Sequence, residues 1–555
     1  LRVLSLIFLI LSVSGIEVVQ EGYSLLVDAG STGSRAFVFH FTEVWEAPAK
    51  ADNTVTHSIT ALLGDMHDIK VKPRTLLSRT VVSLPGMKIK KGISTFATAA
   101  HWEDIVQHLL PIFVNASQTI PRDKWASTSV YMKGTAGMRL LPMQKQALIW
   151  SHVMHLNQYP GNPFSIVFEN LGTIDGSAEA YYAVLASNYI AKAIDGRLHR
   201  IAGAEMVGAL DMGGSSTQLI FYRGGGGVEN RATDSTGGAE TDRNSAETQG
   251  SATKHGPVKA SDFWSHSWLS FGVEVVRERY QQTLIAAHLA AAASAQQEEV
   301  VTPAEVTNGN KGENSGFISV LNPCTHKGFW TDWTGFVSVG DVQQRKDSQT
   351  YRLVGTGDPA KCIALLGELM WPTGSCAEQL AHIGATAEDR AVPLAQQACF
   401  LGDVSHPPMQ GHFYGMSVYY YANDAVRTLL GEDGKKLFAN WPNPTVDELE
   451  AAAHTFCKLP WPGDPLDKTT NTWKNKHPYS GTKQLPHRCF EALYMSLVLE
   501  HAFGFARDAR LITFALDVEG NEVEWTLGYA LAHATATATA TLSAPAQAQG
   551  ASAVI

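Results

Sequence analysis

The sequence predicts an α/β protein with two similar halves that face each other, and three observations support this. The chain has 555 residues, more than one hydrophobic core usually holds, so we expect two domains. The segment "SLLVDAGSTGSRAFVFHF" (Ser24–Phe41) places Asp-x-Gly and small hydroxyl residues between two apolar, strand-like runs. The segment "VGALDMGGSSTQLIFY" (Val207–Tyr222) repeats this layout. One copy also fits an ordinary tight hairpin, in which glycine supplies positive φ, but the recurrence favours duplicated halves.

The remaining chain divides by composition. Strand-like and amphipathic runs, typical of an α/β domain, fill the chain from Tyr23 to about Val184. Residues 224–261 and about 300–315 contain few large apolar side chains, so we expect two disordered insertions. The Ala-rich stretch that begins near Ala286 is expected to extend a helix. Residues 536–555 carry too little apolar bulk to pack and are expected to form a disordered tail.

The N-terminal segment and the cysteines indicate export. "LRVLSLIFLILSVSG" predicts a signal peptide within residues 1–22, with an uncleaved signal anchor as the alternative. Six cysteines, an even number, and a sequon at Asn115 predict a disulfide-bonded glycoprotein that is secreted or lumenal in the secretory pathway. The net charge of -10 provides no basic face for nucleic acid or for a membrane surface. We therefore expect small-molecule partners, and membrane attachment only through an uncleaved anchor.

Both Asp-x-Gly turns have the chemistry of a polyphosphate site. Backbone N–H groups in Gly-rich turns bind phosphate oxygens, and carboxylates hold the accompanying divalent cation. The sequence has no Gly-x-x-x-x-Gly-Lys-Ser/Thr loop, which excludes a P-loop NTPase. "KGTAGMRLL" (Lys133–Leu141) follows a strand-like run, where small residues let a ligand approach the backbone. Glu179 lies in a helix-like run, and by spacing alone it also fits a helix-surface carboxylate.

Five stretches carry a resemblance to a known family: "DAGSTGSR", "GTAGMRLL", "EAYYAVLASNY", "GALDMGGSSTQ" and "EWTLGYAL". They stand in the order of the five apyrase regions, and the chain resembles the apyrase or CD39-like nucleoside triphosphate diphosphohydrolases from about Tyr23 to Leu531. The resemblance implies an actin-like (ribonuclease-H-like) α/β fold with the nucleotide in a cleft between two domains. We assign residues 23–174 and 516–535 to the first domain and 175–515 to the second.

The resemblance also implies an activity, the metal-dependent hydrolysis of nucleoside tri- or diphosphates to a nucleoside monophosphate and phosphate by direct attack of water. Glu179 is expected to accept the proton of that water, while Ser216 and Gln218 orient it. The cation, Ca²⁺ or Mg²⁺, is expected to be held through water by Asp28, Thr135, Glu179, Asp211 and Trp525. The phosphate site is expected to comprise Gly30, Ser31, Thr32, Gly33, Ser34, Thr135, Ala136, Gly213, Gly214 and Ser215.

Tyr421 matches the family tyrosine that stacks on the nucleobase, and core packing is its alternative role. Arg488 stands where a second aromatic residue is expected, and its guanidinium can also lie on a ring. The family pattern is broken at Ala180 and Val184, so the packing behind Glu179 is expected to differ. It is also broken at Ser270, where vertebrate members often carry a cysteine whose usual partner is absent here as well. By resemblance, the disulfides are Cys324–Cys362, Cys376–Cys399 and Cys457–Cys489.

Two other functions fit parts of the sequence. Another actin-like phosphotransferase or an exopolyphosphatase would share the paired Asp-x-Gly turns, although the secretory start and the "GTAGMRLL" region argue against it. A nucleotide-binding protein without turnover would keep the fold and lose the catalytic groups. Intact Glu179, Ser216 and Gln218 argue against that second alternative.

Overall fold

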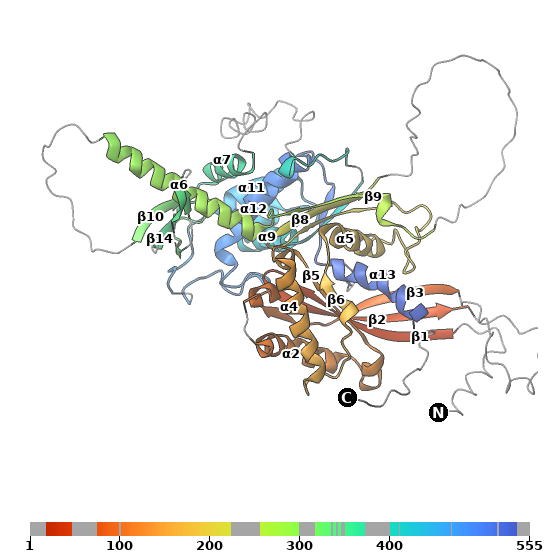
Figure 1. Ribbon diagram of the computed structural model, residues 1–555. Coiled ribbons are helices and arrows are strands. Elements are labelled where there is room, and N and C mark those ends of the chain that lie inside the picture. The colour runs from red at the N-terminus through yellow and green to blue at the C-terminus, as the bar shows by residue number, and fades with distance from the viewer. Residues whose placement is uncertain are drawn as a thin grey trace, which may run out of the picture.

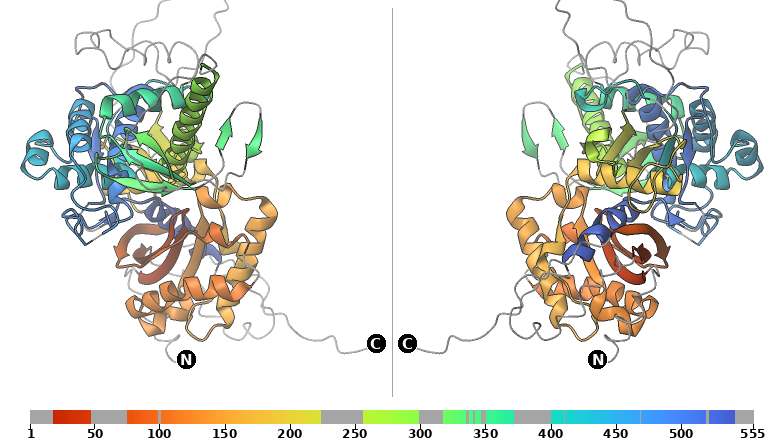
Figure 2. Two further views of the ribbon diagram at one scale, coloured as in Figure 1. Left: turned by 90° about the vertical axis from the view of Figure 1, so that its left-hand side faces the viewer. Right: turned by 90° about the vertical axis from the view of Figure 1, so that its right-hand side faces the viewer.

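The computed structural model contains two lobes, each built on its own β-sheet (Figures 1 and 2). Figure 2 shows the lobe coloured red to orange below the lobe coloured green to blue. The structure describes residues 18–46, 75–98, 101–223, 256–298, 317–334, 337–339, 342–345, 350–371, 400–409, 411–467, 469–518 and 521–540.

The first lobe has a six-stranded sheet in the order β3-β2-β1-β5-β6, with β4 paired to β2. β1 and β2 form the antiparallel hairpin, and β5 runs parallel to β1. Alternate residues of β1 point to opposite faces: Leu25 and Val27 pack beneath the outer helices, and Leu26 faces the second lobe. The strands are β1 (Val18–Ala29), β2 (Gly33–Trp45), β3 (Leu76–Leu84), β4 (Lys88–Lys90), β5 (Ser129–Gly134) and β6 (Leu171–Thr173), and the outer helices are α2 (Trp102–Thr119) and α4 (Met143–Val153).

The second lobe repeats this topology in a five-stranded sheet of order β16-β15-β7-β8-β9. β7 and β8 form an antiparallel hairpin, and β15 runs parallel to β7, as β5 does to β1. The sequence prediction of an α/β protein with duplicated halves is therefore confirmed. The strands are β7 (Gly208–Met212), β8 (Ser216–Tyr222), β9 (Phe263–Leu269), β15 (Phe413–Ser417) and β16 (Ile512–Phe514), and the outer helices include α9 (Val418–Leu429), α11 (Val446–Lys458) and α12 (Arg488–Leu497).

Two helices, α5 (Gly176–Ile190) and α13 (Trp525–Ala540), form a layer that both sheets share (Figure 1). One hydrophobic cluster joins Leu26 of the first sheet, Ile220 of the second sheet and Leu527 of α13. α5 has apolar residues on most of its surface, including Ala180 and Val184, both completely buried. Ala180 and Val184 are positions at which the chain departs from the family pattern, and both side chains lie inside the shared layer.

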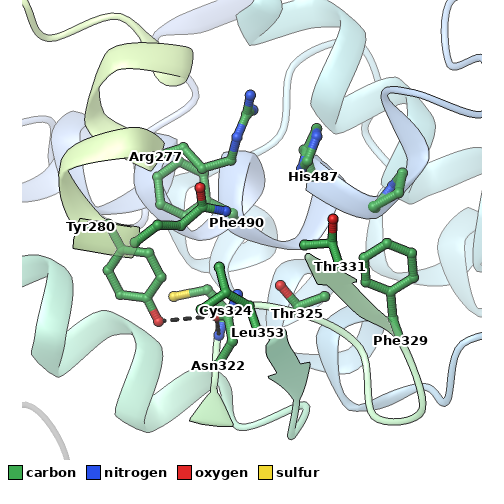
Figure 3. Close-up of a pocket in the computed structure, with 12 residues that line it drawn as sticks. Arg277, Tyr280, Asn322, Cys324, Thr325, Phe329, Thr331, Leu353, His487 and Phe490 are labelled. Carbon is green, nitrogen blue, oxygen red and sulfur yellow. Dashed lines mark hydrogen bonds between the residues drawn. The ribbon is translucent and has the colours of Figure 1, made fainter. Parts of the chain in front are cut away.

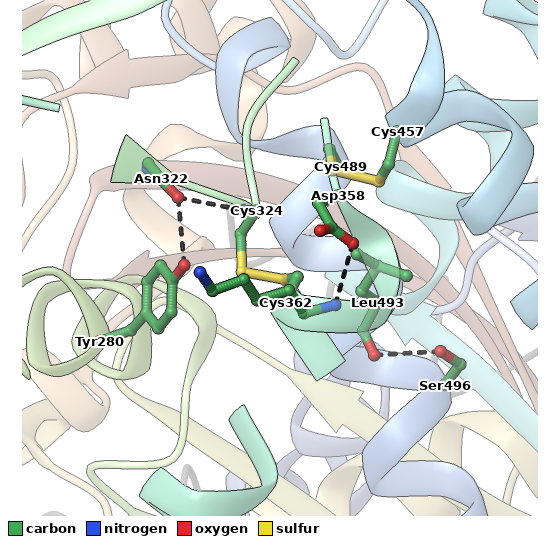
Figure 4. Close-up of a disulfide and its surroundings, with 10 residues drawn as sticks. Tyr280, Asn322, Cys324, Asp358, Cys362, Cys457, Cys489, Leu493 and Ser496 are labelled. Atoms are coloured by element: carbon green, nitrogen blue, oxygen red, sulfur yellow. Dashed lines mark hydrogen bonds between the residues drawn. A yellow bond between two sulfur atoms is a disulfide. The ribbon is translucent and has the colours of Figure 1, made fainter. Parts of the chain in front are cut away.

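An accessory unit packs beside the second lobe, and each of the two has one described disulfide (Figure 4). It comprises the small sheet β10-β14-β11, the paired strands β12 and β13, and helices α6 and α7. Cys324–Cys362 joins the end of β10 to α7, and Cys457–Cys489 joins α11 to α12, as predicted. Cys376 and Cys399 lie outside the described residues. The bounds are α6 (Val273–Glu298), β10 (Phe317–Asn322), β11 (Trp330–Trp333), β12 (Val337–Val339), β13 (Val342–Arg345), β14 (Thr350–Gly355) and α7 (Pro359–Met370).

The structure corrects three boundaries. β1 already begins at Val18, inside the predicted 1–22 leader, and pairs with β2 from that residue on. The predicted 224–261 insertion is ordered from residue 256, because Val258 is buried against the shared helical layer. α13 continues to Ala540, past the predicted start of the tail. α6 confirms the helix expected at the Ala-rich stretch, and residues 300–315 lie outside the described part. Within the described ranges, no helix has the length and apolar character to cross a membrane.

Gly528 sets the spacing of the shared helical layer. A Cβ atom at Gly528 would lie 1.8 Å from the carbonyl oxygen of Tyr182 on α5. Alanine normally favours a helix over glycine by about 1 kcal/mol, but here it clashes with backbone that cannot swing aside. We expect Gly528→Ala to lower the free energy of unfolding by about 1–3 kcal/mol in urea titrations. Gly256→Ala is the control, since its Cβ meets nothing within 4 Å, and equal stability of the two variants would contradict the prediction.

Candidate functional site

The two Asp-x-Gly turns approach each other from opposite lobes. A Cβ atom at Gly214 would lie 2.9 Å from the Ser31 hydroxyl oxygen and 3.1 Å from the Thr32 methyl carbon. A Cβ at Gly137 would lie 2.7 Å from Ser31 Cα. None of the turn glycines at 30, 33, 213 and 214 has positive φ, so they do not play the part that glycine has in an ordinary tight hairpin, the alternative interpretation of these segments. Glycine is required here for close approach of the two turns.

The carbonyl groups of the second turn are held by its surroundings. Gly213 and Gly214 accept hydrogen bonds from the first N–H groups of α6, at Val273 and Glu274. In the first turn, Thr32 accepts from Lys91 N. Fixing the carbonyls in this way prevents the turns from presenting lone pairs to an anion, which favours phosphate binding by the N–H groups.

The other predicted phosphate residues lie nearby. Thr135 and Ala136 stand between β5 and α3 (Ala136–Arg139), and Thr135 N donates to Ala29 O at 3.4 Å. Ser34 pairs with Ala29 in the β1–β2 hairpin, is fully buried, and has no hydrogen-bond partner for its hydroxyl oxygen. The structure thus brings the first-lobe set to one sheet edge, while Gly213, Gly214 and Ser215 form the opposing turn.

Four buried acidic side chains converge between the turns: Asp28 at the end of β1, Asp211 in β7, Glu179 in α5 and Glu524 just before α13. Burial, and then the charges of Glu179, Glu524 and Asp211, raise the pKa of Asp28 well above its usual range. Burial, and then the charges of Glu179 and Glu524, raise the pKa of Asp211 to about 8. Burial and mutual repulsion both disfavour the charged carboxylates, and a bound cation would offset this penalty.

The donor set fits a hard cation held through water. Carboxylates suit Ca²⁺ and Mg²⁺, and Asp28 Oδ1 is buried without a hydrogen-bond partner. Across the described residues, no three or more His, Cys, Asp or Glu side chains are grouped closely enough to ligate a metal directly. Trp525, predicted to belong to this site, is 2% exposed and packs against Tyr182 and Tyr529. The charge of the neighbouring Glu524 helps to raise the pKa of Asp28 and of Asp211. The sequence signal for Glu524 was its place directly before Trp525 in the "EWTLGYAL" motif.

Glu179, Ser216 and Gln218 share one hydrogen-bond network. Gln218 Nε2 donates to Ser216 Oγ at 2.8 Å and lies 3.4 Å from Glu179 Oε2. Glu179 stands in the first turn of α5, where the Asp175 side chain accepts from Ala178 N and caps the helix. The three predicted catalytic residues are therefore adjacent, and Glu179 is buried beneath the cleft instead of lying on a helix surface.

Arg139 completes this network, and our sequence analysis missed it. Its Nη1 donates to Glu179 Oε2 at 2.8 Å, and its Nη2 donates to Ser216 Oγ at 3.2 Å. Burial raises the pKa of Glu179, and the charge and hydrogen bond of Arg139 lower it in part. Ser216 Oγ accepts from Arg139 and Gln218, so its own O–H is left to donate elsewhere. Arg139 belongs to the "GTAGMRLL" motif, so the signal for it was present.

Three further residues were also missed. Ser267 Oγ accepts from Gln218 Nε2 at 2.9 Å and fixes that amide. Arg35 donates to Glu524 at 3.1 Å and to Glu522 at 2.5 Å, and its positive charge partly offsets the acidic cluster. Lys88 is exposed, and its charge lowers the pKa of Asp28 and of Glu524. The local pattern "KIKKG" gave no indication that Lys88 faces the acidic cluster.

The expected base-binding residues behave differently from each other. Tyr421 lies in α9, is half-buried, and hydrogen-bonds to Arg35 of the other lobe. Arg488 is 3% exposed and donates to Ser480, Tyr479 and Glu491. The structure therefore contradicts the expectation that the Arg488 guanidinium lies on a base, because this group is enclosed by protein acceptors.

A hollow lies beside α6 (Figure 3). Its walls come from α6, the β10–β11 region and the start of α12, including Arg277, Asn322 and His487. Burial, and then the charges of Arg277 and Arg488, lower the pKa of His487 to about 3. None of the predicted site residues lines this hollow.

Comparison with known proteins gives a consistent result. The sequence model of the GDA1/CD39 (nucleoside phosphatase) family matches residues 16–546. The Golgi apyrase of Saccharomyces cerevisiae is 24% identical over 536 residues, covering 94% of this chain and 71% of the yeast protein. Ectonucleoside triphosphate diphosphohydrolase 7 of Homo sapiens is 26% identical over 532 residues, covering 92% and 72%. The crystal structure of nucleoside triphosphate hydrolases from Neospora caninum has a TM-score of 0.56 at 14% identity, covers 97% and 96%, and shares the fold.

The acidic cluster predicts a pH dependence of stability in the absence of divalent cations. The folded state raises the pKa of Asp211 from 3.8 to about 8, so it binds this proton more tightly than the unfolded chain. That stabilisation is complete below about pH 4 and is lost as the pH rises towards 8. In EDTA, we expect Asp211→Asn to gain stability relative to the wild type between pH 5 and pH 8, measured by urea unfolding. Asp433→Asn, at an exposed position, is the control, and parallel pH profiles for all three proteins would contradict the prediction.

Proposed function

The chain belongs to the GDA1/CD39 (nucleoside phosphatase) family, and from this premise we propose that it hydrolyses nucleoside tri- and diphosphates to the monophosphate and phosphate. The observation that carries the proposal is the Glu179–Ser216–Gln218 network, which lies between two phosphate-type turns and beside a buried acidic cluster. A nucleotide-binding protein without turnover would have no need to keep a carboxylate that accepts from Gln218, whose amide also donates to Ser216.

Glu179 is the general base in this proposal. Its carboxylate accepts a proton from the attacking water, and the free O–H of Ser216 with the amide of Gln218 fixes the position of that water. Arg139 holds one carboxylate oxygen, so the other oxygen is the one available to the water. Ser267 fixes the Gln218 amide from behind. Water attacks phosphorus directly, with no phosphoenzyme.

The two turns bind the phosphate chain. The backbone N–H groups of Gly30–Ser34, Ala136, Gly214 and Ser215 would bind phosphate oxygens and stabilise the charge that develops on them. The N–H groups of Thr135 and Gly213 already donate to Ala29 O and Ser216 O, so these two residues would border the phosphate without donating from the backbone. Lys88 is the exposed cation at this site.

A Ca²⁺ or Mg²⁺ ion would be held through water by Asp28, Thr135, Glu179 and Asp211. Glu524 would help to hold it as well, since its charge acts on both Asp28 and Asp211. Trp525 would contribute by packing behind the site, since its ring is buried. When bound, the ion neutralises phosphate charge and orients the terminal phosphate. The orphaned Asp28 oxygen and the raised pKa of Asp211 support this assignment.

We also propose that Tyr421 contacts the nucleobase and that the protein works in the lumen of the secretory pathway or is secreted. The Tyr421 hydroxyl bonds to Arg35, which in turn contacts Glu524, so the ring lies beside the acidic cluster. The two disulfides support an oxidising compartment. Asn115, the proposed glycosylation site, lies in α2 and is half-buried.

A substrate panel tests the reaction class. We expect phosphate release from ATP, ADP and UTP without any acceptor, in Mg²⁺ or Ca²⁺, and loss of that release in EDTA. Inorganic tripolyphosphate and long-chain polyphosphate serve as the comparison substrates. Turnover of long-chain polyphosphate in preference to nucleotides would replace the proposal with an exopolyphosphatase.

Substitution of the base tests the mechanism. Glu179→Gln keeps the size and hydrogen bonding of the side chain but removes the proton acceptor, so kcat should fall by about 10²- to 10⁴-fold. Nucleotide binding, measured by equilibrium dialysis with radiolabelled ADP, should be largely kept. Glu432→Gln, which alters an exposed side chain, is the matched control. Wild-type turnover by a folded Glu179→Gln variant would refute the assignment.

A further inference from the structure

Tyr479 is an exposed aromatic residue beside Tyr421. Its side chain lies in the segment between α11 and α12, and the residue is 44% exposed. The two ring centroids are 5.2 Å apart with a tilt of 40°. Tyr421 reaches the acidic cluster through Arg35 and Glu524, so the ring pair lies at the side of the proposed phosphate site. An exposed ring beside the proposed base-contacting residue offers a further aromatic face to a planar ligand.

Residues on both sides of Tyr479 are buried and bound by polar contacts. His477 and Ser480 are 2% and 0% exposed. His477 Nδ1 lies 2.8 Å from Ser480 Oγ, and His477 Nε2 lies 3.1 Å from Asp424 Oδ2. Asp424 belongs to α9, the helix that carries Tyr421. The short segment that presents Tyr479 is thereby attached to the helix that presents Tyr421.

Arg488 fixes the same segment from the other side. Its Nε donates to Ser480 Oγ at 2.8 Å, its Nη2 donates to Tyr479 O at 3.0 Å, and its Nη1 donates to Glu491 Oε2 at 2.5 Å. Because Ser480 accepts from Arg488, its O–H is free to donate to His477 Nδ1, and the Nε2–H of His477 then donates to Asp424. Every donor has a matched acceptor, so the network specifies one conformation.

We propose that Tyr479 contacts the nucleobase together with Tyr421, and that Arg488, Ser480 and His477 are positioning residues that hold its ring in place. The assignment rests on the proposed function. Arg488 acts through the backbone of Tyr479 and the side chain of Ser480, and never touches the ligand. The segment between α11 and α12 contains mostly turns, so the polar network supplies the rigidity that regular secondary structure would otherwise give.

The chemistry of the ring pair determines the ligand class. Aromatic faces attract any planar heterocycle and read no donor or acceptor pattern, so the pair accepts both purines and pyrimidines. A purine has the larger face and gains more contact. Removal of the Tyr479 ring should therefore affect ATP more than UTP, and should leave ligands without a base unaffected.

Kinetics on Tyr479 variants test the contact. We expect Tyr479→Ala to raise KM for ATP by about 5- to 20-fold and KM for UTP by less, with kcat within about twofold of the wild type. Tyr479→Phe keeps the ring and should retain the wild-type KM. The inhibition constant of inorganic tripolyphosphate should not change. Phe168→Ala, which removes another exposed ring, is the matched control.

The outcomes separate the two levels of inference. If the wild-type protein releases no phosphate from any nucleotide, the proposed function fails. If it does turn over nucleotides and Tyr479→Ala leaves KM for ATP unchanged, only the Tyr479 assignment fails. An equal loss of tripolyphosphate binding would also overturn it, because the side chain would then act on the phosphate site.

A double-mutant cycle tests the positioning role. Ser480→Ala removes the acceptor of Arg488 Nε and the partner of His477, and it leaves a small side chain that packs without clash. We expect it to raise KM for ATP by about 3- to 10-fold with kcat kept, and to add little to Tyr479→Ala in the double variant. Additive effects would overturn the positioning role. The quenching of ethenoadenosine diphosphate fluorescence, which reports stacking directly, should weaken in both single variants, and unchanged quenching would contradict the proposal.

Discussion

The structure depends on the burial of several carboxylates in one place. Asp28 and Asp211 occupy equivalent positions in the two lobes, since each lies in the first strand of a hairpin and precedes its turn. Burial is the largest cause of the raised pKa at both residues, and mutual repulsion adds to it. A fold that brings such groups together loses free energy at neutral pH unless positive charge enters. The proposed cation would supply such charge at the place where the two lobes meet.

The helical layer between the sheets converts this electrostatic constraint into a geometric one. α5 carries Glu179 in its first turn, and Glu524 immediately precedes α13. The close contact at Gly528 fixes the distance between these helices, so it also fixes two of the acidic groups relative to each other. The packing of α5 against α13 in the core therefore also sets how close the charges of Glu179 and Glu524 lie to each other.

Arginine residues distribute the opposing charge. Arg139 reaches from the first lobe to Glu179 and Ser216, and Arg35 bonds both to Glu524 and to Tyr421 of the second lobe. Arg139 thus connects the first lobe with two proposed catalytic residues, and Arg35 connects it with the proposed base-contacting tyrosine. Planar, multiply donating guanidinium groups suit this role better than lysine, because they satisfy several acceptors in fixed directions.

The sequence by itself determined the duplicated α/β plan, the two phosphate-type turns and the residues Glu179, Ser216 and Gln218. The plan and the turns rest on local patterns, since apolar alternation defines β1 and β7 and small residues define the turns. The roles of Glu179, Ser216 and Gln218 rest on the family resemblance. Through the family resemblance, the sequence also predicted both disulfides that the structure describes, Cys324–Cys362 and Cys457–Cys489. Only the tertiary structure decided that Arg139 and Glu524 belong to the site, because their partners lie 40 and 489 residues away in the chain. It likewise decided that Arg488 turns inward and Tyr479 outward, since the direction of a side chain depends on acceptors that distant segments supply.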